Sequence, residues 1–83
     1  MKEMTFGGAL KALKAGKKVA RTGWNGKGMY LYLADGKLLT QEIGDGSYPF
    51  ADSIVMKTAD NRYCIGWLAS QTDMLAEDWC TVK

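Results

Sequence analysis

The sequence predicts an α+β fold, in which one N-terminal helix packs on an antiparallel sheet of about five or six strands, with a short helical turn before the last strand. Three observations predict it. Apolar residues recur at helical spacing near the N-terminus, later apolar runs have a period of two, and polar, glycine-rich turns separate those runs. At 83 residues there is room for one core, so we expect a single domain over residues 1–83.

The helix is predicted to run from about residue 6 to residue 15. Thr5 is a suitable N-cap, and Gly16 is placed to end the helix in a left-handed conformation. Apolar residues at i, i+3, i+4 and i+7 share one helical face. They are Phe6, Ala9, Leu10 and Leu13.

Strands are predicted where the apolar period becomes two. The first covers residues 19–21 and leads into a loop at 22–28 that holds three glycines around one tryptophan. The second covers residues 29–33. An Asp-Gly pair within residues 34–37 is typical of a tight hairpin turn, so a third strand is expected at 38–40.

The C-terminal half predicts a second hairpin, with strands at residues 53–58 and 63–68 joined by a turn at 59–62. Residues 70–73, Ser-Gln-Thr-Asp, fit a capping box that opens a helical turn. Residues 79–82 close the chain as the last strand.

Composition argues against several classes of function. There is no histidine, and Cys64 and Cys80 are not in a Cys-x-x-Cys pair, so we expect no metal site and two buried, reduced thiols. The net charge of +2 is too small to indicate a nucleic-acid partner, and no apolar run is long enough for a signal peptide or a membrane span. A core this small favours self-association. The basic residues are concentrated in residues 11–27, so one end of the molecule could favour an anion.

We predict that the chain is not an enzyme and needs no cofactor. Without histidine, catalysis would depend on carboxylates, a lysine or a cysteine. Asp73 is accounted for by the capping box, and Glu77 and Asp78 by a solvated turn. Neither Ser70 nor Cys64 has an adjacent base that would activate it as a nucleophile.

The aromatic residues indicate ligand binding. Trp67 and Trp79 lie in strand patterns, for which core packing is the first expectation. Trp24 instead lies between glycines on a loop, beside Arg21 and Lys27, where a flat ligand could meet the ring and an anion the cations. The loop at residues 44–49 carries the only proline and a lone aromatic residue.

These residue types suit a small polar aromatic ligand such as a nucleotide, because a base stacked on an aromatic ring gains about 1 to 3 kcal/mol and amides and carboxylates read hydroxyls and base edges. The candidate ligand-binding residues are Arg21, Trp24, Asn25, Tyr48, Trp67, Ser70, Gln71, Thr72, Asp73 and Met74.

Three segments, at residues 5–13, 23–31 and 67–79, together resemble a family of small phage proteins, the second type of Thoeris anti-defence protein. The most specific part is Trp-Leu-Ala-Ser-Gln-Thr-Asp-Met at residues 67–74. The resemblance covers nearly the whole chain. One departure is Gly8, which stands where an acid usually completes a capping box with Thr5 and which puts the first helical turn in doubt.

The resemblance implies a sponge that binds a cyclic ADP-ribose isomer, glycocyclic ADP-ribose, made by a TIR-domain sensor, and holds it intact in the cytoplasm of the infected bacterial host. It also implies a homotetramer with ligand pockets at subunit contacts, and a ligand range that could include cyclic oligonucleotides. The alternatives are a nucleotide hydrolase, a small phage module that binds a protein and, last, a nucleic-acid binder.

Overall fold

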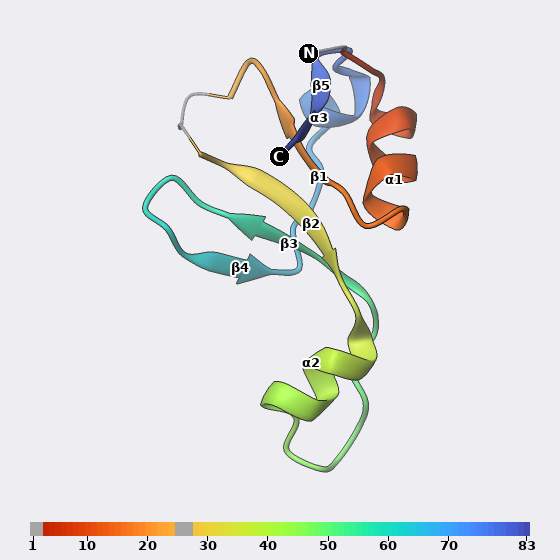
Figure 1. The fold of residues 1–83 in the computed structure, drawn as a ribbon, viewed down its shortest axis with the longest axis vertical. Coiled ribbons are helices and arrows are strands. Elements are labelled where there is room, and N and C mark those ends of the chain that lie inside the picture. Colours follow the sequence, from red (N-terminus) through yellow and green to blue (C-terminus); the bar gives the residue numbers. More distant parts are fainter. Residues whose placement is uncertain (1–2, 25–27) are drawn as a thin grey trace.

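The computed structural model describes residues 3–24 and 28–83. Within these residues the chain forms three helices and five strands (Figure 1). The helices are α1 (Phe6–Lys14), α2 (Gly36–Ile43) and α3 (Gln71–Leu75). The strands are β1 (Lys18–Arg21), β2 (Tyr30–Ala34), β3 (Ser53–Lys57), β4 (Tyr63–Ile65) and β5 (Trp79–Val82). The predicted α+β fold is confirmed.

The five strands form one antiparallel sheet in the order β4-β3-β2-β1-β5. Helix α1 packs against β5, β1 and β2 and so covers one face of this sheet. The core lies between them, and its buried residues are Ala9, Leu13, Val19, Leu31 and Trp79. Because side chains alternate along a strand, the neighbours of Leu31 on β2 point to the opposite face.

The predicted N-terminal helix is confirmed and ends one residue early, at Lys14. The Thr5 hydroxyl accepts a hydrogen bond from the backbone nitrogen of Gly8 at 3.2 Å, so the threonine caps the first turn without an acid three residues later. Gly16 has φ +86°, the left-handed conformation predicted for it.

The strand predicted at residues 38–40 is wrong, because these residues belong to α2. Asp35 is the N-cap of this helix, and its Oδ1 accepts from the Lys37 nitrogen at 2.8 Å. The partner of β2 is β3, with Ala34 opposite Ser53. The first hairpin of the sheet therefore encloses α2 and the loop that follows it.

The second hairpin, β3–β4, is confirmed, although β4 ends at Ile65 and not at residue 68. Gly66, with φ +92°, turns the chain there. Since β4 is at the edge of the sheet, Cys64 is exposed, and the prediction that it is buried is wrong. Cys80 is buried as predicted, with its Sγ 3.5 Å from the Ala20 carbonyl oxygen.

Helix α2 and the loop at residues 44–52 extend away from the body formed by α1 and the sheet, and the molecule is elongated, with a long axis of 41 Å (Figure 1). Apolar side chains on this extension are exposed, among them Leu38, Ile43, Tyr48 and Phe50. Among the described residues, no helix is both long and apolar enough to cross a membrane.

Candidate functional site

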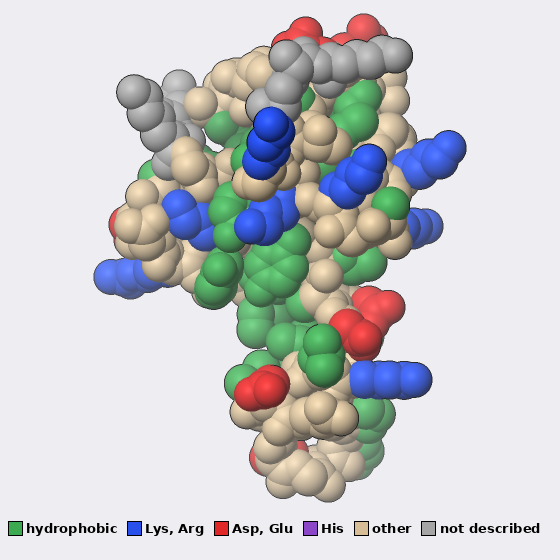
Figure 2. Space-filling view, in the orientation of Figure 1, with side chains coloured by type: hydrophobic (Ala, Val, Ile, Leu, Met, Phe, Trp, Pro, Cys, Tyr) green, Lys and Arg blue, Asp and Glu red, His purple; other side chains and the backbone are tan. Residues whose placement is uncertain are grey.

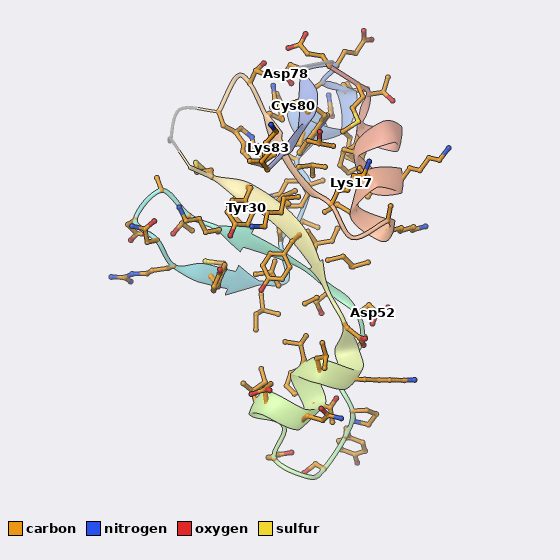
Figure 3. All side chains as sticks on the ribbon, in the orientation of Figure 1. Lys17, Tyr30, Asp52, Asp78, Cys80 and Lys83 are labelled. Atoms are coloured by element: carbon orange, nitrogen blue, oxygen red, sulfur yellow. The ribbon has the colours of Figure 1, made fainter. Side chains whose placement is uncertain are left out.

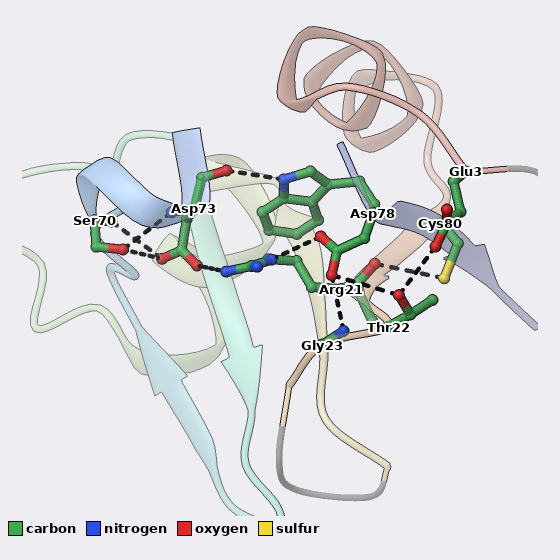
Figure 4. Close-up of polar contacts among 10 residues, drawn as sticks. Glu3, Arg21, Thr22, Gly23, Ser70, Asp73, Asp78 and Cys80 are labelled. Carbon is green, nitrogen blue, oxygen red and sulfur yellow. Dashed lines mark hydrogen bonds and ion pairs between the residues drawn. The ribbon is translucent and has the colours of Figure 1, made fainter. Parts of the chain in front are cut away.

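Arg21, at the end of β1, is held between two aspartates that follow it by more than fifty residues (Figure 4). Its Nε donates to Asp78 Oδ1 at 2.9 Å and its Nη1 donates to Asp73 Oδ1 at 3.0 Å. The side chains of Arg21, Asp73 and Asp78 are 16%, 15% and 25% exposed, so these ion pairs are shielded from solvent far more than a pair on an open surface.

Asp73 also joins this ion pair to the start of α3. Its Oδ2 accepts from the backbone nitrogen of Ser70 at 3.1 Å and from the Ser70 hydroxyl at 2.8 Å, while its own nitrogen donates to that hydroxyl at 3.1 Å. The predicted capping box is thus present. Both carboxylate oxygens of Asp73 are occupied within the fold.

These contacts keep both aspartates ionised at neutral pH. The Arg21 guanidinium is the main cause that lowers the pKa of Asp78. For Asp73, partial burial opposes ionisation, but hydrogen bonds from Ser70 and Arg21, with a smaller contribution from Trp24, outweigh it and lower the pKa. The Arg21 pKa is raised in return, mainly by Asp78.

Three tryptophans meet beside this network. Trp79 is fully buried, and the centroid of its ring lies 5.4 Å from that of Trp24 and 6.1 Å from that of Trp67, both in edge-to-face arrangements. Trp24 and Trp67 also contact each other edge to face at 6.5 Å and are half-buried. The Trp79 Nε1 donates to the Asp73 carbonyl oxygen at 3.0 Å, which connects the aromatic cluster to α3.

The structure therefore brings together Arg21, Trp24, Trp67, Ser70 and Asp73, which come from distant parts of the chain. Trp24 and Trp67 both pack against the core, and their rings keep part of their surface in solvent.

Three other candidates are on α3 and face solvent: Gln71 and Thr72 are exposed and Met74 is 49% exposed. Asn25 lies outside the described residues. Tyr48 is 85% exposed on the loop at residues 44–52, which lies at the opposite end of the molecule from α3 (Figure 1). Within one chain, Tyr48 is not part of the tryptophan site.

Comparison with known proteins identifies the family. The family model described as the Thoeris anti-defense 2-like domain matches residues 4–82. A protein named Thoeris anti-defense 2, from Bacillus phage SP01, is 47% identical over 87 residues, an alignment that covers 98% of this chain and 97% of the relative. The chain belongs to the Thoeris anti-defense 2-like family. Its role is phage anti-defence against the Thoeris system.

Asp78 is the residue of this Thoeris anti-defense site that sequence reasoning missed. The prediction that it lies in a solvated turn is wrong, because it binds Arg21 and its Oδ2 accepts from the Gly23 nitrogen at 2.8 Å. No local signal in the sequence could have found it, because the contact depends on the pairing of β1 with β5. Arg21 pairs with Trp79, which places the preceding aspartate beside the guanidinium.

A cavity of about 620 Å³ lies elsewhere, between the end of α1, the end of β2 and the extension that carries α2. It is lined by Leu13, Lys14, Gly16, Leu33, Asp35, Gly36, Lys37, Phe50, Ala51 and Asp52. None of these is a candidate ligand residue. Asp52 accepts from the Gly36 nitrogen at 2.8 Å and Asp35 caps α2, so both acids have structural tasks. We therefore keep the tryptophan cluster as the candidate site.

Proposed function

We propose that this chain is a sponge that binds a cyclic ADP-ribose-type nucleotide, such as glycocyclic ADP-ribose, and holds it without degrading it. Membership of the Thoeris anti-defense 2-like family, over residues 4–82, is the observation that carries the proposal. A sponge blocks signalling by lowering the concentration of free signal, so its activity requires affinity and no turnover. It also requires the protein to be in the host cytoplasm, where a bacterial signal is made.

The tryptophan cluster supports a nucleotide as the ligand. Trp24 and Trp67 are half-buried, which holds the rings in place while leaving part of each available to a base. Gln71 and Thr72 supply an amide and a hydroxyl on exposed positions of the neighbouring α3, where they suit the hydroxyls and base edges of a nucleotide.

The state of the acids favours binding over hydrolysis. A general acid needs a raised pKa, but Asp73 and Asp78 have lowered ones. Both are also held by hydrogen bonds inside the protein. Their task in the proposal is to fix Arg21 and α3 beside the tryptophans.

We further propose that the protein assembles as a homotetramer with shared ligand pockets. The exposed apolar side chains of the α2 extension, Leu38, Ile43, Tyr48 and Phe50, support self-association, because a small protein gains stability by burying such surface against another copy. In an assembly of this kind, the extension of one subunit could bring Tyr48 to the pocket of another. Sedimentation analysis measures the assembly state, and a monomer at working concentrations would contradict this part of the proposal.

The decisive experiment is calorimetric titration of the protein with glycocyclic ADP-ribose, followed by heat denaturation of the complex and chromatography of the released nucleotide. Tight binding with intact ligand supports a sponge. A new product that disappears in Asp73→Asn would establish hydrolysis. Retention of a host protein together with indifference to nucleotides would indicate a protein-binding module.

Trp24→Ala is expected to weaken the binding of this ligand by about 1 to 3 kcal/mol, because the ring would no longer stack on a base. Leu68→Ala is the matched control, since Leu68 is an 89% exposed apolar side chain beside Trp67. If Trp24→Ala lowers the melting temperature and leaves the affinity unaltered, the ring is part of the core only.

A further inference from the structure

Asp78 binds each of the three residues that directly precede Trp24 in the chain. Its carboxylate accepts from Arg21 Nε at 2.9 Å and from the Gly23 nitrogen at 2.8 Å (Figure 4). Its carbonyl oxygen accepts from the Thr22 nitrogen at 3.1 Å. The Trp24 nitrogen in turn donates to the Arg21 carbonyl oxygen at 3.3 Å. The backbone that leads into this candidate ring is therefore attached to Asp78 at every step.

Asp78 is itself held by the strand pairing beside it. The next residue, Trp79, pairs with Arg21 and exchanges two backbone hydrogen bonds with Met4, of 2.7 and 3.1 Å. Figure 3 marks Asp78 at the end of the molecule that carries β5 and α3, away from the α2 extension. Figure 2 shows acidic side chains at this end and most of the basic ones across the rest of the body. Among the residues that the structure describes, the cation that pairs with Asp78 is Arg21, so this carboxylate has fixed partners.

Gly23 permits this contact because it has no side chain. A Cβ there would lie 2.8 Å from Asp78 Oδ2, closer than a carbon and a carboxylate oxygen approach without a bond. The φ of Gly23 lies outside the left-handed region, so its own backbone conformation does not require glycine. Turning the carboxylate aside to admit a methyl group would break its bond to the Gly23 nitrogen. Glycine at this position is therefore matched to Asp78.

The same glycine makes an external attachment necessary. Without a Cβ, glycine adopts a wider range of φ and ψ than other residues, so Gly23 by itself defines the direction of Trp24 poorly. The ring contacts of Trp24 with Trp67 and Trp79 are edge to face and leave it half-buried. The bond from the Gly23 nitrogen to a carboxylate is charge-assisted, and it restricts the backbone one residue before the ring.

We propose that Asp78 is a positioning residue of the tryptophan site: it fixes the backbone at Gly23 so that the Trp24 ring is in place before the nucleotide binds. This inference rests on the proposed function, and it assigns Asp78 no contact with the ligand. A ring that is ordered in the free protein does not have to be immobilised by the ligand. Immobilising one large side chain on binding weakens the affinity by roughly three- to tenfold.

The test is a double-mutant cycle, in which glycocyclic ADP-ribose is titrated into the wild type, Asp78→Ala, Trp24→Ala and the variant with both substitutions. We expect Asp78→Ala to weaken binding by about three- to tenfold and to cause no further loss in the Trp24→Ala background. Equal losses in the two backgrounds would overturn the proposal, because Asp78 would then act independently of the ring.

Val55→Ala is the control for lost stability. Val55 is 1% exposed and lies outside the core cluster that contains Trp79, so its truncation should lower the melting temperature and leave the affinity unaltered. If Val55→Ala weakens binding as much as Asp78→Ala does, the effect of Asp78 is one of stability and the proposal is wrong.

Gly23→Ala tests the same contact while keeping the carboxylate, and it decides the question if Asp78→Ala does not fold. The added methyl group displaces Asp78 Oδ2, so we expect a loss of affinity similar to that of Asp78→Ala. Gly7→Ala is the matched control, because a Cβ at Gly7 meets nothing closer than 3.7 Å, and it should bind as the wild type does. Wild-type affinity in Gly23→Ala would contradict the proposal.

The indole N–H signal of Trp24, followed by NMR in the ligand-free protein, separates a failure of this inference from a failure of the proposed function. We expect Asp78→Ala and Gly23→Ala to shift this signal and Gly7→Ala to leave it in place. An unshifted signal would overturn the inference even if the wild type binds the ligand tightly. A shifted signal in a protein that does not bind glycocyclic ADP-ribose would support the attachment of Trp24 to Asp78 and refute the proposed function instead.

Discussion

Removing the Asp73 carboxylate should destabilise the fold far more than removing that of Glu77, the exposed acid that follows α3. Asp73→Ala deletes the acceptor of three hydrogen bonds, two from Ser70 and one from Arg21, in a side chain that is 15% exposed. It keeps the backbone carbonyl that accepts from Trp79. Ser70 still caps α3 through the backbone nitrogen of residue 73, but loss of the acceptor of the Ser70 nitrogen costs about 1 kcal/mol and loss of the charge-assisted bond to Arg21 costs about 1.5 to 3 kcal/mol.

The two losses are not independent, because Arg21 keeps its second partner, Asp78. We therefore expect a decrease of about 2 to 4 kcal/mol in the free energy of unfolding, which lowers the melting temperature by roughly 10 to 25 °C in a domain of this size.

The assay is thermal denaturation followed by circular dichroism at neutral pH. Glu77→Ala is the matched control, because Glu77 is an exposed acid four residues further along the chain, and its removal should change the stability by no more than about 0.5 kcal/mol. Equal effects of the two substitutions would refute the reasoning. If Asp73→Ala also weakens nucleotide binding, the network positions the tryptophan site, whereas a loss of stability alone would limit Asp73 to capping and ion pairing.

The remaining predictions concern pH, backbone packing and thiol exposure. In the folded state the Arg21 guanidinium lowers the pKa of Asp78. The contribution of Asp78 to stability is therefore complete above the ordinary carboxyl pKa of about 4 and is lost as the pH falls through the lowered value. Urea denaturation at neutral and acid pH should show this loss of stability. The loss on acidification should be smaller in Asp78→Asn, and an unchanged pH dependence in this variant would contradict the prediction. Gly36→Ala should destabilise by about 1 to 3 kcal/mol, because a Cβ there would collide with the backbone oxygen of Phe50, in the loop after α2. Gly7→Ala in α1 meets no such obstacle and should be neutral or stabilising. Thermal denaturation of the two variants checks this, and a stable Gly36→Ala would mean that the loop moves freely. Cys64 should react with a thiol reagent in the native protein and Cys80 only after denaturation, as mass spectrometry would show; equal native rates would contradict the buried position of Cys80.

Features that depend on contacts within a few residues were predictable from the sequence. The cap at Thr5 and the capping box at residues 70–73 each join groups three positions apart. Gly16 ends α1 through its own backbone conformation, and the hairpin turn at residues 59–62 joins strands that are neighbours along the chain. Local sequence is sufficient for such elements because every group involved is close in the chain.

The Asp-Gly pair at Asp35 and Gly36 shows where local reasoning stops. The same two residues suit a hairpin turn and the start of a helix, and the two apolar residues that follow, Leu38 and Leu39, are too few to distinguish a helical period from a strand period. The choice depended on partners far away. Strand β2 pairs with β3, and Gly36 donates to Asp52, so α2 forms within the long connection between them.

For the candidate site, the sequence by itself determined the chemistry: a loop tryptophan, a run of polar residues on a short capped helix, and a family resemblance that the comparisons confirmed. The tertiary structure decided which groups meet. Arg21 reaches Asp73 and Asp78 across 52 and 57 residues, and these two ion pairs exist only because β1 lies beside β5. A hydrogen bond between distant residues depends on strand order, and strand order is settled by burial of the whole core.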